Sequence, residues 1–313
     1  MVNWKVLITD GLEDSGIIQL ENFSTVDNRT GISPDELLGI IQDYDALIVR
    51  SRTKVNGSVL QTAKKLKVVG RSGVGVDNID LVKAKELGIC VVNSPLGPTI
   101  AVAELTIGLI LCLLRDIPLA NASLKAGTWA KKELMGSELY GKTLGIIGFG
   151  RIGMAVAERA KAFGMTIIVN DDNLQEEEIM TPGIRLVTCD EVFSQSDIIS
   201  LHVPLTEQTK GMINEQSLGI MKDGVRIVCT ARGGVIDEDA ILAALNQGKV
   251  AGLALDVFKK EPPDVSELIL HPKVIVTPHI GVQTYESQSR TGYDIACEVL
   301  SALENKVLRF RIV

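Results

Sequence analysis

The segment Gly148-Phe149-Gly150-Arg151-Ile152-Gly153 has the residue types and the spacing to bind a pyrophosphate. In a G-x-G-x-x-G pattern the first glycine permits a tight turn, the second lets the backbone approach the phosphates, and the third allows helix and strand to pack closely. The pattern follows an apolar run at residues 144–147 and precedes a helical pattern at residues 154–163. In that context the N–H groups and the partial positive charge at the helix start indicate a dinucleotide site.

An acidic residue follows at the distance that such a site requires. A second apolar run at residues 166–169 leads into Asn170-Asp171-Asp172, so that Asp171 lies 18 residues after Gly153. A carboxylate there accepts hydrogen bonds from an adenosine ribose. Two adjacent carboxylates with no neighbouring arginine would repel a 2′-phosphate, which favours NAD over NADP. An ordinary strand–helix turn would also need glycines, but it would leave the position of the acid unexplained.

Histidines are the next candidates, because NAD exchanges a hydride and another group must handle the matching proton. Of the three histidines, His279 and His202 each follow a strand-like run, whereas His271 precedes one and would lie at the opposite edge of the sheet. Position alone leaves His279 and His202 as equal candidates for a general acid/base.

Two charged residues favour His279. Arg232 follows the run that ends at Cys229, and an arginine there can hold a substrate carboxylate as a bidentate pair. Glu261 follows the run that ends at Asp256, and a carboxylate beside an imidazole fixes its tautomer and favours its protonated form. Each residue alone would be an ordinary surface charge. Together with His279 they follow consecutive strands at one edge of one predicted sheet, beside the dinucleotide pattern.

The remaining patterns predict the elements that position these groups. Apolar runs alternate with helical patterns in two series, before and after a long apolar helix at residues 99–115, which predicts an α/β fold with two doubly wound parallel sheets. Ser33-Pro34-Asp35-Glu36 predicts a helix start with a capping box. A last helix at about residues 284–303 would return to the first domain and leave a ligand cleft between the two. The predicted strands are residues 5–9, 46–50, 68–70, 89–93, 144–147, 166–169, 198–201, 225–229, 250–256 and 274–277.

Composition excludes several classes of protein. A chain of 313 residues is long enough for two domains, and its net charge of -7 argues against nucleic-acid binding. The five cysteines are scattered without a C-x-x-C, which predicts no structural metal and a reducing, cytoplasmic compartment. The N-terminus lacks a signal-peptide pattern, and the longest apolar stretch, residues 105–114, is too short to span a membrane.

Longer segments resemble the D-isomer-specific 2-hydroxy-acid dehydrogenase family over nearly the whole chain. The similar segments are LIVRSRTKV (47–55), GRSGVGVDNIDL (70–81), VAELTIGL (102–109), MGSELYGKTLGIIGFGRIG (135–153), ARGGVIDEDAILAALNQGKVAGLALDVFKKEPP (231–263) and VTPHIG (276–281). Within the family they are most similar to the members that oxidise 3-phosphoglycerate to 3-phosphohydroxypyruvate, the first step of a route to serine. The chain ends at Val313, so we expect no C-terminal regulatory domain of the serine-binding kind.

The resemblance implies a flavodoxin-like substrate domain at residues 1–97 and 283–313, a Rossmann NAD-binding domain at residues 98–282, and a homodimer through the cofactor domains. It implies His279 as acid/base, Glu261 as its partner, and Arg232 as the residue that orients carboxylate and carbonyl. The cofactor-binding positions are Gly148, Gly150, Arg151, Ile152, Gly153, Asp171, His202, Val203, Pro204, Thr209, Cys229, Thr230, Ala231, Arg232, Asp256, His279 and Gly281. The substrate-binding positions are Arg50, Ser51, Arg52, Ser72, Gly73, Val74, Arg232 and His279.

The expected mechanism follows from these roles. The substrate carboxylate would sit on backbone N–H groups of Ser72-Gly73-Val74-Gly75 and on Arg232, and His279 would take the hydroxyl proton as the hydride leaves. Arg50 and Arg52 share one face of an extended segment, so both are candidates to bind a substrate phosphate, with Lys131 reaching them across the dimer. Plain surface charge is the alternative for both arginines.

Some positions depart from the family pattern: Pro98 and Thr99, Asn170 and Asp172 on either side of Asp171, Cys229 where asparagine or a small polar residue is usual, and Lys131 where arginine is usual.

Three alternatives to the proposed substrate and function stay open. Glyoxylate, hydroxypyruvate or lactate would use the same catalytic residues but would need neither Arg50 nor Arg52. An NAD-binding regulatory module could retain the residues, although an acidic chain with no added interaction segment argues against it. A structural role leaves the glycine and acid spacing unexplained.

Overall fold

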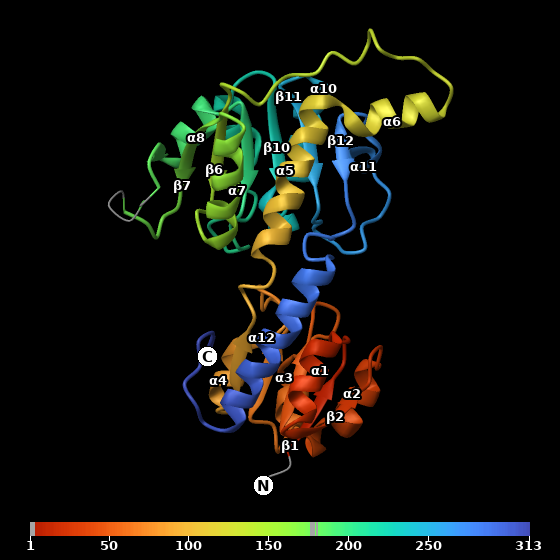
Figure 1. Ribbon diagram of the computed structural model, residues 1–313, viewed down its shortest axis with the longest axis vertical. Coiled ribbons are helices and arrows are strands. Elements are labelled where there is room, and N and C mark those ends of the chain that lie inside the picture. Colours follow the sequence, from red (N-terminus) through yellow and green to blue (C-terminus); the bar gives the residue numbers. More distant parts are fainter. Residues whose placement is uncertain (1–3, 176–178, 180) are drawn as a thin grey trace. The chain divides into compact units, whose positions relative to one another are not determined.

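The computed structural model describes residues 4–175, 179 and 181–313, and the chain divides into two compact units (Figure 1). Unit 1 comprises Met1–Thr99 and Val282–Val313, and unit 2 comprises Ile100–Gly281. Unit 1 contains a five-stranded sheet and unit 2 a seven-stranded sheet, and the neighbouring strands of both sheets are parallel. The predicted α/β class with two parallel sheets is confirmed.

The strand order in unit 1 is β2-β1-β3-β4-β5, which is the flavodoxin-like order. Helices cover both faces of this sheet, so β3 is buried along its whole length and is a continuous apolar run. The order reverses direction between β1 and β3, and ligands of open parallel sheets bind at the carboxyl ends of such strands. The strands are β1 (Trp4–Ile8), β2 (Ser24–Asn28), β3 (Ala46–Val49), β4 (Val68–Arg71) and β5 (Cys90–Asn93).

Two layers of helices enclose the unit 1 sheet: α1 and α12 pack on one face, and α2, α3 and α4 on the other. The predicted capping box is present at α2, where the Ser33 hydroxyl accepts from the Glu36 N–H at 3.3 Å and the Glu36 carboxylate accepts from the Ser33 N–H at 3.0 Å. The helices are α1 (Asp14–Glu21), α2 (Pro34–Ile40), the 3₁₀ helix η1 (Ile41–Asp43), α3 (Gly57–Thr62), α4 (Leu81–Glu86) and α12 (Tyr285–Leu303).

The strand order in unit 2 is β12-β11-β10-β9-β6-β7-β8, and it reverses direction between β6 and β9. Helices α5 and α7 cover one face of this sheet, and α8 to α11 cover the other. The strands are β6 (Thr143–Ile147), β7 (Thr166–Asn170), β8 (Ile184–Leu186), β9 (Ile198–Leu201), β10 (Val225–Cys229), β11 (Val250–Leu255) and β12 (Val274–Val276). The helices are α5 (Thr99–Arg115), α6 (Ile117–Lys125), α7 (Arg151–Ala162), α8 (Cys189–Gln195), α9 (Glu215–Ile220), η3 (Gly233–Val235), α10 (Glu238–Asn246) and α11 (Glu267–Leu270).

Helix α7 begins earlier than its sequence pattern predicts. The pattern predicts a helix from residue 154, but the helix begins at Arg151 with Gly150 as its N-cap. The last glycine of the motif, Gly153, therefore lies within the first helical turn. This brings the N–H groups at the helix start into the glycine-rich loop itself.

Helix α6 and the loop after it project from the body of unit 2 (Figure 1). Large apolar side chains are exposed along this projection, among them Leu119 at 56%, Leu124 at 60%, Trp129 at 77% and Met135 at 86%. Within the described ranges, none of the helices combines the length and the apolar character that a bilayer span needs.

Candidate functional site

The glycine-rich loop after β6 is shaped by close contacts that only glycine allows. Gly148 has φ +90°, and a Cβ on it would lie 2.7 Å from the His202 carbonyl carbon. A Cβ on Gly153 would lie 2.3 Å from the Gly148 oxygen, whereas the space beside Gly150 is open. Gly150, the N-cap of α7, makes no side-chain cap hydrogen bond to the N–H groups of the first turn. Open space beside uncapped N–H groups fits the pyrophosphate of a dinucleotide.

Asp171 joins the two ends of this motif. Its Oδ2 accepts a hydrogen bond from the Phe149 N–H at 2.8 Å, and its Oδ1 accepts from the Asn173 N–H at 3.0 Å. Oδ1 also accepts from the Asn173 side-chain amide at 3.3 Å, so Oδ2 is the oxygen that keeps a lone pair for a ribose hydroxyl. Within the described part of the chain neither Asp171 nor Asp172 forms an ion pair, so the local charge stays negative.

His279 and Glu261 form a hydrogen-bonded pair. The Nδ1 of His279 lies 2.7 Å from the Oε2 of Glu261, and the other oxygen, Oε1, accepts from the Phe258 N–H at 3.1 Å. Burial raises the pKa of Glu261, but the hydrogen bonds from His279 and Phe258 and the charges of His279 and Arg232 outweigh it, so the pKa lies below its ordinary value. Glu261 is thus held ionised on Nδ1, which leaves Nε2 of His279 as the nitrogen for proton transfer.

Asp256 fixes the loop on both sides of His279. Its side chain is buried, with 1% of the residue exposed, and its Oδ1 accepts from the Thr277 hydroxyl at 2.6 Å and from the Ile280 N–H at 2.8 Å. Its Oδ2 accepts from the Gly281 N–H at 2.8 Å. His279 itself has φ +52°, a left-handed conformation that is strained for a residue with a Cβ. The Asp256 hydrogen bonds hold the loop in that conformation.

Arg232 lies in a loop pressed against the segment that carries Glu261. A Cβ on Gly233, the next residue, would lie 2.0 Å from the Phe258 carbonyl carbon. The Arg232 guanidinium donates to the Ala231 carbonyl at 2.7 Å, and its charge lowers the pKa of Glu261. The structure therefore brings Arg232, Glu261 and His279 together at the carboxyl edge of one sheet.

The environment of His202 separates it from His279. His202 is half-buried and its backbone lies against Gly148; its Nε2 lies 2.8 Å from the Ser200 hydroxyl, and burial of the ring lowers its pKa to about 4. An imidazole that is neutral at pH 7 is poorly suited to be the protonated acid. His271, before β12, accepts from the Lys273 N–H at 3.1 Å. Among the three histidines, geometry favours His279 as the acid/base.

The other predicted cofactor positions lie in the same group of loops. Cys229, at the end of β10, is buried, and burial raises the pKa of its thiol to about 11, so it is no thiolate nucleophile. The remaining positions are Arg151 and Ile152 in the first turn of α7, Val203, Pro204 and Thr209 after β9, Thr230 and Ala231 after β10, and Gly281 after β12.

In unit 1, Asp10 organises the loop after β3 and distinguishes the two candidate arginines. Its nearly buried carboxylate accepts from the Arg50 N–H at 2.8 Å, the Thr53 hydroxyl at 2.6 Å and the Arg52 Nε at 3.1 Å. The Arg52 guanidinium also donates to the Thr9 carbonyl at 2.6 Å. By contrast, the Arg50 guanidinium makes no hydrogen bond or ion pair within the described ranges, and burial lowers its pKa. Arg52 therefore has a structural role, and Arg50 is the arginine available to an anion.

The loop after β4 keeps only part of the expected carboxylate site. The Gly73 N–H donates to the Ser94 hydroxyl at 2.8 Å, and the Ser72 N–H donates to the Val49 carbonyl at 2.9 Å. The N–H groups of Val74 and Gly75 donate to no other residue that the structure describes. Of the predicted N–H donors, those of Val74 and Gly75 are thus the ones available.

Several organising residues escaped the sequence reasoning. Asp10 carries a usable signal, because it is an acid directly after a strand at the point where the sheet order reverses. Thr277 is adjacent to the predicted VTPHIG motif, but only the structure shows its bond to Asp256. Thr106, in the apolar helix α5, carries no local signal for its contact with Thr230, since the two are 124 residues apart.

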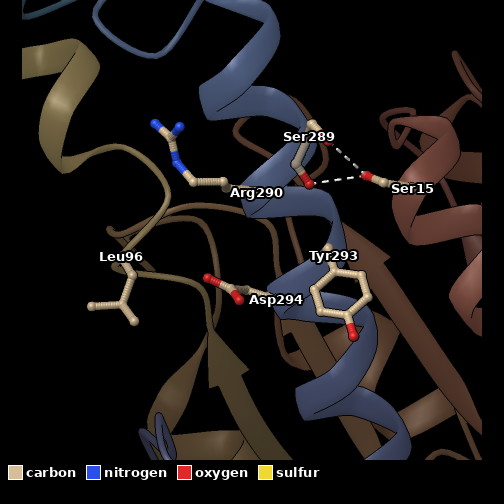
Figure 2. Close-up of a pocket in the computed structure, with 6 residues that line it drawn as sticks. All are labelled: Ser15, Leu96, Ser289, Arg290, Tyr293 and Asp294. Atoms are coloured by element: carbon tan, nitrogen blue, oxygen red, sulfur yellow. Dashed lines mark hydrogen bonds between the residues drawn. The ribbon is translucent and has the colours of Figure 1, made fainter.

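A separate hollow of about 510 Å³ lies on unit 1 (Figure 2). It is lined by Ser15, Leu96, Ser289, Arg290, Tyr293 and Asp294. None of these belongs to the predicted site, and Figure 2 shows Ser15 hydrogen-bonded to Ser289 across the α1–α12 contact.

Comparisons with known proteins agree with this geometry. Residues 107–281 match the NAD-binding domain of the D-isomer specific 2-hydroxyacid dehydrogenases. The chain is 48% identical to a D-3-phosphoglycerate dehydrogenase of Methanocaldococcus jannaschii and 46% identical to that of Bacillus subtilis, over 97% and 95% of its own length. It covers 58% and 56% of those two proteins, so it spans little more than half of their length.

Solved structures give the same result for the whole chain. A glyoxylate reductase from Paecilomyes thermophila superposes with a TM-score of 0.92 at 33% identity, covering 100% of this chain and 99% of that one. The resemblance read from the sequence motifs is thus confirmed, and the chain belongs to the D-isomer specific 2-hydroxyacid dehydrogenase family.

Proposed function

We propose that the protein is an NAD-dependent dehydrogenase that interconverts 3-phosphoglycerate and 3-phosphohydroxypyruvate. The observation that carries the reaction class is the His279–Glu261 hydrogen bond of 2.7 Å, in the unit that also holds the glycine-rich loop. The substrate rests on the relatives of 48% and 46% identity named D-3-phosphoglycerate dehydrogenase.

The residues of the chain divide the chemistry as follows. Bound NAD supplies the hydride acceptor. The N–H groups at the start of α7 hold the pyrophosphate, and Asp171 accepts from ribose hydroxyls. His279 takes the substrate hydroxyl proton on Nε2, while ionised Glu261 holds Nδ1–H and stabilises the imidazolium. In the reverse direction His279 returns that proton, and Arg232 orients the carboxylate and polarises the ketone.

The carboxylates at the end of β7 support NAD rather than NADP. A 2′-phosphate would meet Asp171 and Asp172 with no cation paired to either in the described ranges. We expect Asp171→Ala to weaken NADH binding by about 1.5–3 kcal/mol, the usual contribution of a charge-assisted hydrogen bond, and to relax the bias against NADPH. Fluorescence titration of both cofactors measures this, and unchanged affinities for both would remove Asp171 from the site.

For the substrate, we propose that Arg50 binds the phosphate and that Arg52 supports the loop. The Arg50 guanidinium lacks a partner in the described ranges, whereas Arg52 is held by Asp10 and backbone carbonyls. The N–H groups of Val74 and Gly75 remain as donors for the carboxylate. Lys131 is exposed and is a weaker candidate for the phosphate.

We propose a homodimer through unit 2 in a reducing, cytoplasmic compartment. The exposed apolar residues gathered on α6 and the loop after it support an interaction surface there, and dimer burial would remove them from water. The cysteines are unpaired thiols. Light scattering of wild type and of Leu124→Glu, an exposed position on α6, tests this. A monomeric wild type would overturn the dimer.

Steady-state assays of a panel of D-2-hydroxy acids and their keto forms test the proposed substrate. We expect the highest kcat/KM with the phosphorylated pair and NAD(H). Equal or higher values with hydroxypyruvate or glyoxylate would contradict it. A glyoxylate or hydroxypyruvate reductase is the second candidate, favoured by the TM-score of 0.92 to a glyoxylate reductase and by the structural role of Arg52. An NAD-binding regulatory module would show cofactor binding without turnover of any acid.

A further inference from the structure

We propose that Thr106, buried in helix α5, is a positioning residue that sets the Thr230 hydroxyl as a hydrogen-bond acceptor toward the cofactor. Thr106 is 0% exposed, and its hydroxyl donates to the Val102 carbonyl at 2.8 Å. The same oxygen lies 3.0 Å from the Thr230 hydroxyl oxygen. The inference rests on the proposed function, because it concerns how that cofactor is held.

The donor and acceptor roles of the two threonine hydroxyls follow from the number of protons that each one carries. A threonine hydroxyl has one proton and two acceptor lone pairs. With the Thr106 proton assigned to the Val102 carbonyl, Thr230 becomes the donor in the contact between the two threonines. The single proton of Thr230 is therefore turned toward α5. The lone pairs of Thr230 that remain can only accept a hydrogen bond from another group.

The position of Thr230 would let its free lone pairs accept a hydrogen bond from a bound cofactor. Thr230 directly follows β10 at the carboxyl edge of the sheet, two residues before Arg232, and is partly exposed. A nicotinamide nucleotide carries an amide NH₂ group and ribose hydroxyls, all of which can donate. A hydroxyl locked as an acceptor selects such donors, whereas a freely rotating hydroxyl loses rotational freedom on binding them.

Helix α5 also supports the second loop of the site. Val102, one turn before Thr106, lies 3.2 Å from the position that a Cβ on Gly281 would occupy. Thus a single helix contacts the loop of Arg232 through Thr106 and the loop of His279 through Val102. Both loops are therefore positioned by contacts with the same helix. In this way a buried residue that touches no ligand can affect ligand binding.

The test compares Thr106→Val, which keeps the shape and removes the hydroxyl, with Thr106→Ser, which keeps the hydroxyl. We expect Thr106→Val to raise the Kd for NADH roughly three- to tenfold, the fold-change of one hydrogen bond, and Thr106→Ser to bind within about twofold of wild type. Thr230→Val should weaken binding similarly, and the double variant should be no weaker than Thr230→Val alone, because the two residues act through one contact.

Ser196→Ala is the matched control. Ser196 is a buried hydroxyl in unit 2 that also donates to a carbonyl four residues earlier, at 2.6 Å, but it is the C-cap residue of α8 and lies outside the proposed site. It should leave the Kd for NADH unchanged. Tm, measured in parallel, separates a loss of stability from a loss of binding. If Thr106→Val does not fold, Thr230→Val against Thr230→Ser carries the test, with lost affinity expected for valine only.

Two outcomes would overturn the inference. One is a Thr106→Val variant with lower Tm and an unchanged Kd for NADH, which would make Thr106 a packing residue. The other is full additivity in the double variant. Wild-type protein that binds no NADH would overturn the proposed function, and with it this inference. If wild type binds NADH and Thr106→Val binds it with the same Kd, the inference is overturned while the proposed function stands.

Discussion

Each unit of this protein uses a buried aspartate to hold a loop at the carboxyl edge of its sheet, but the two loops are left in different states. Asp256 in unit 2 holds the loop that presents His279, and His279 is already paired with Glu261. Asp10 in unit 1 holds the loop that presents Arg50, whose guanidinium is unpaired within the described ranges.

The paired His279 and the unpaired Arg50 guanidinium are suited to different tasks. A general acid/base needs its tautomer and orientation fixed before substrate arrives, and the internal pair with Glu261 provides this. A group that recognises an anion must keep its donors for the ligand. We therefore assign the proposed chemistry to unit 2 and the proposed choice of substrate to unit 1.

The largest effect should come from His279→Ala. We expect kcat to fall by roughly 10²–10⁴-fold with NADH affinity retained, the usual range for a lost general acid/base. His271→Ala, on the amino-terminal side of β12, is the matched control and should leave kcat unchanged. Near-normal turnover of His279→Ala would contradict the assignment of His279 as the acid/base.

Asp256→Asn should come next, because an amide nitrogen would replace one of the acceptors that face the loop N–H groups. Leaving buried donors unsatisfied costs about 1–3 kcal/mol each, which in a unit of this size lowers Tm by several degrees. We also expect kcat to fall on every substrate, since the His279 loop loses its anchor. The matching Asp10→Asn variant should retain kcat on hydroxypyruvate. Equal losses in the two variants would erase the distinction between the units.

Glu261→Gln should change the pH dependence more than the maximal rate. The glutamine cannot stabilise an imidazolium as the carboxylate does, so the pH at which ketone reduction falls by half should move down. A pH profile that coincides with that of wild type would show that the contact does not affect the proton transfer.

The same variant gives a stability test with a defined sign. The pKa of Glu261 is lowered in the folded protein, so its carboxylate stabilises the fold above the ordinary carboxyl pKa, and that contribution disappears as pH falls through the lowered pKa. Wild-type Tm should therefore fall on acidification below about pH 4 more steeply than the Tm of Glu261→Gln. Parallel curves would contradict the lowered pKa.

Sequence patterns predicted those parts of the fold that depend on local chemistry. The buried strand β3 is a continuous apolar run, and it lies where that run predicted it. The edge strand β2, Ser24–Asn28, is polar and partly exposed, so it carried no such signal. The fold class followed from the alternation of strands and helices along the chain. That alternation is still recognisable when a single element such as β2 is not predicted.

The site was predictable in type but not in detail. Motif spacing predicted the residues that follow each strand, because parallel strands bring their carboxyl ends to one edge. Spacing could not show that Arg52 would be held by Asp10, 42 residues earlier in the chain. Nor could it show that burial would lower the pKa of His202 while the His279 side chain stays 41% exposed, because burial depends on contacts between distant segments.

The most direct test of the division between the units is a comparison of two variants on two substrates. Arg50→Ala and His279→Ala are assayed for reduction of 3-phosphohydroxypyruvate and of hydroxypyruvate, with Arg52→Ala as the control arginine. We expect His279→Ala to lose kcat/KM on both substrates alike. We expect Arg50→Ala to lose roughly 10–100-fold on the phosphorylated substrate only, the effect of one charge-assisted contact, and less so at high salt. Equal losses of Arg50→Ala on both substrates, or a selective loss in His279→Ala, would contradict this division.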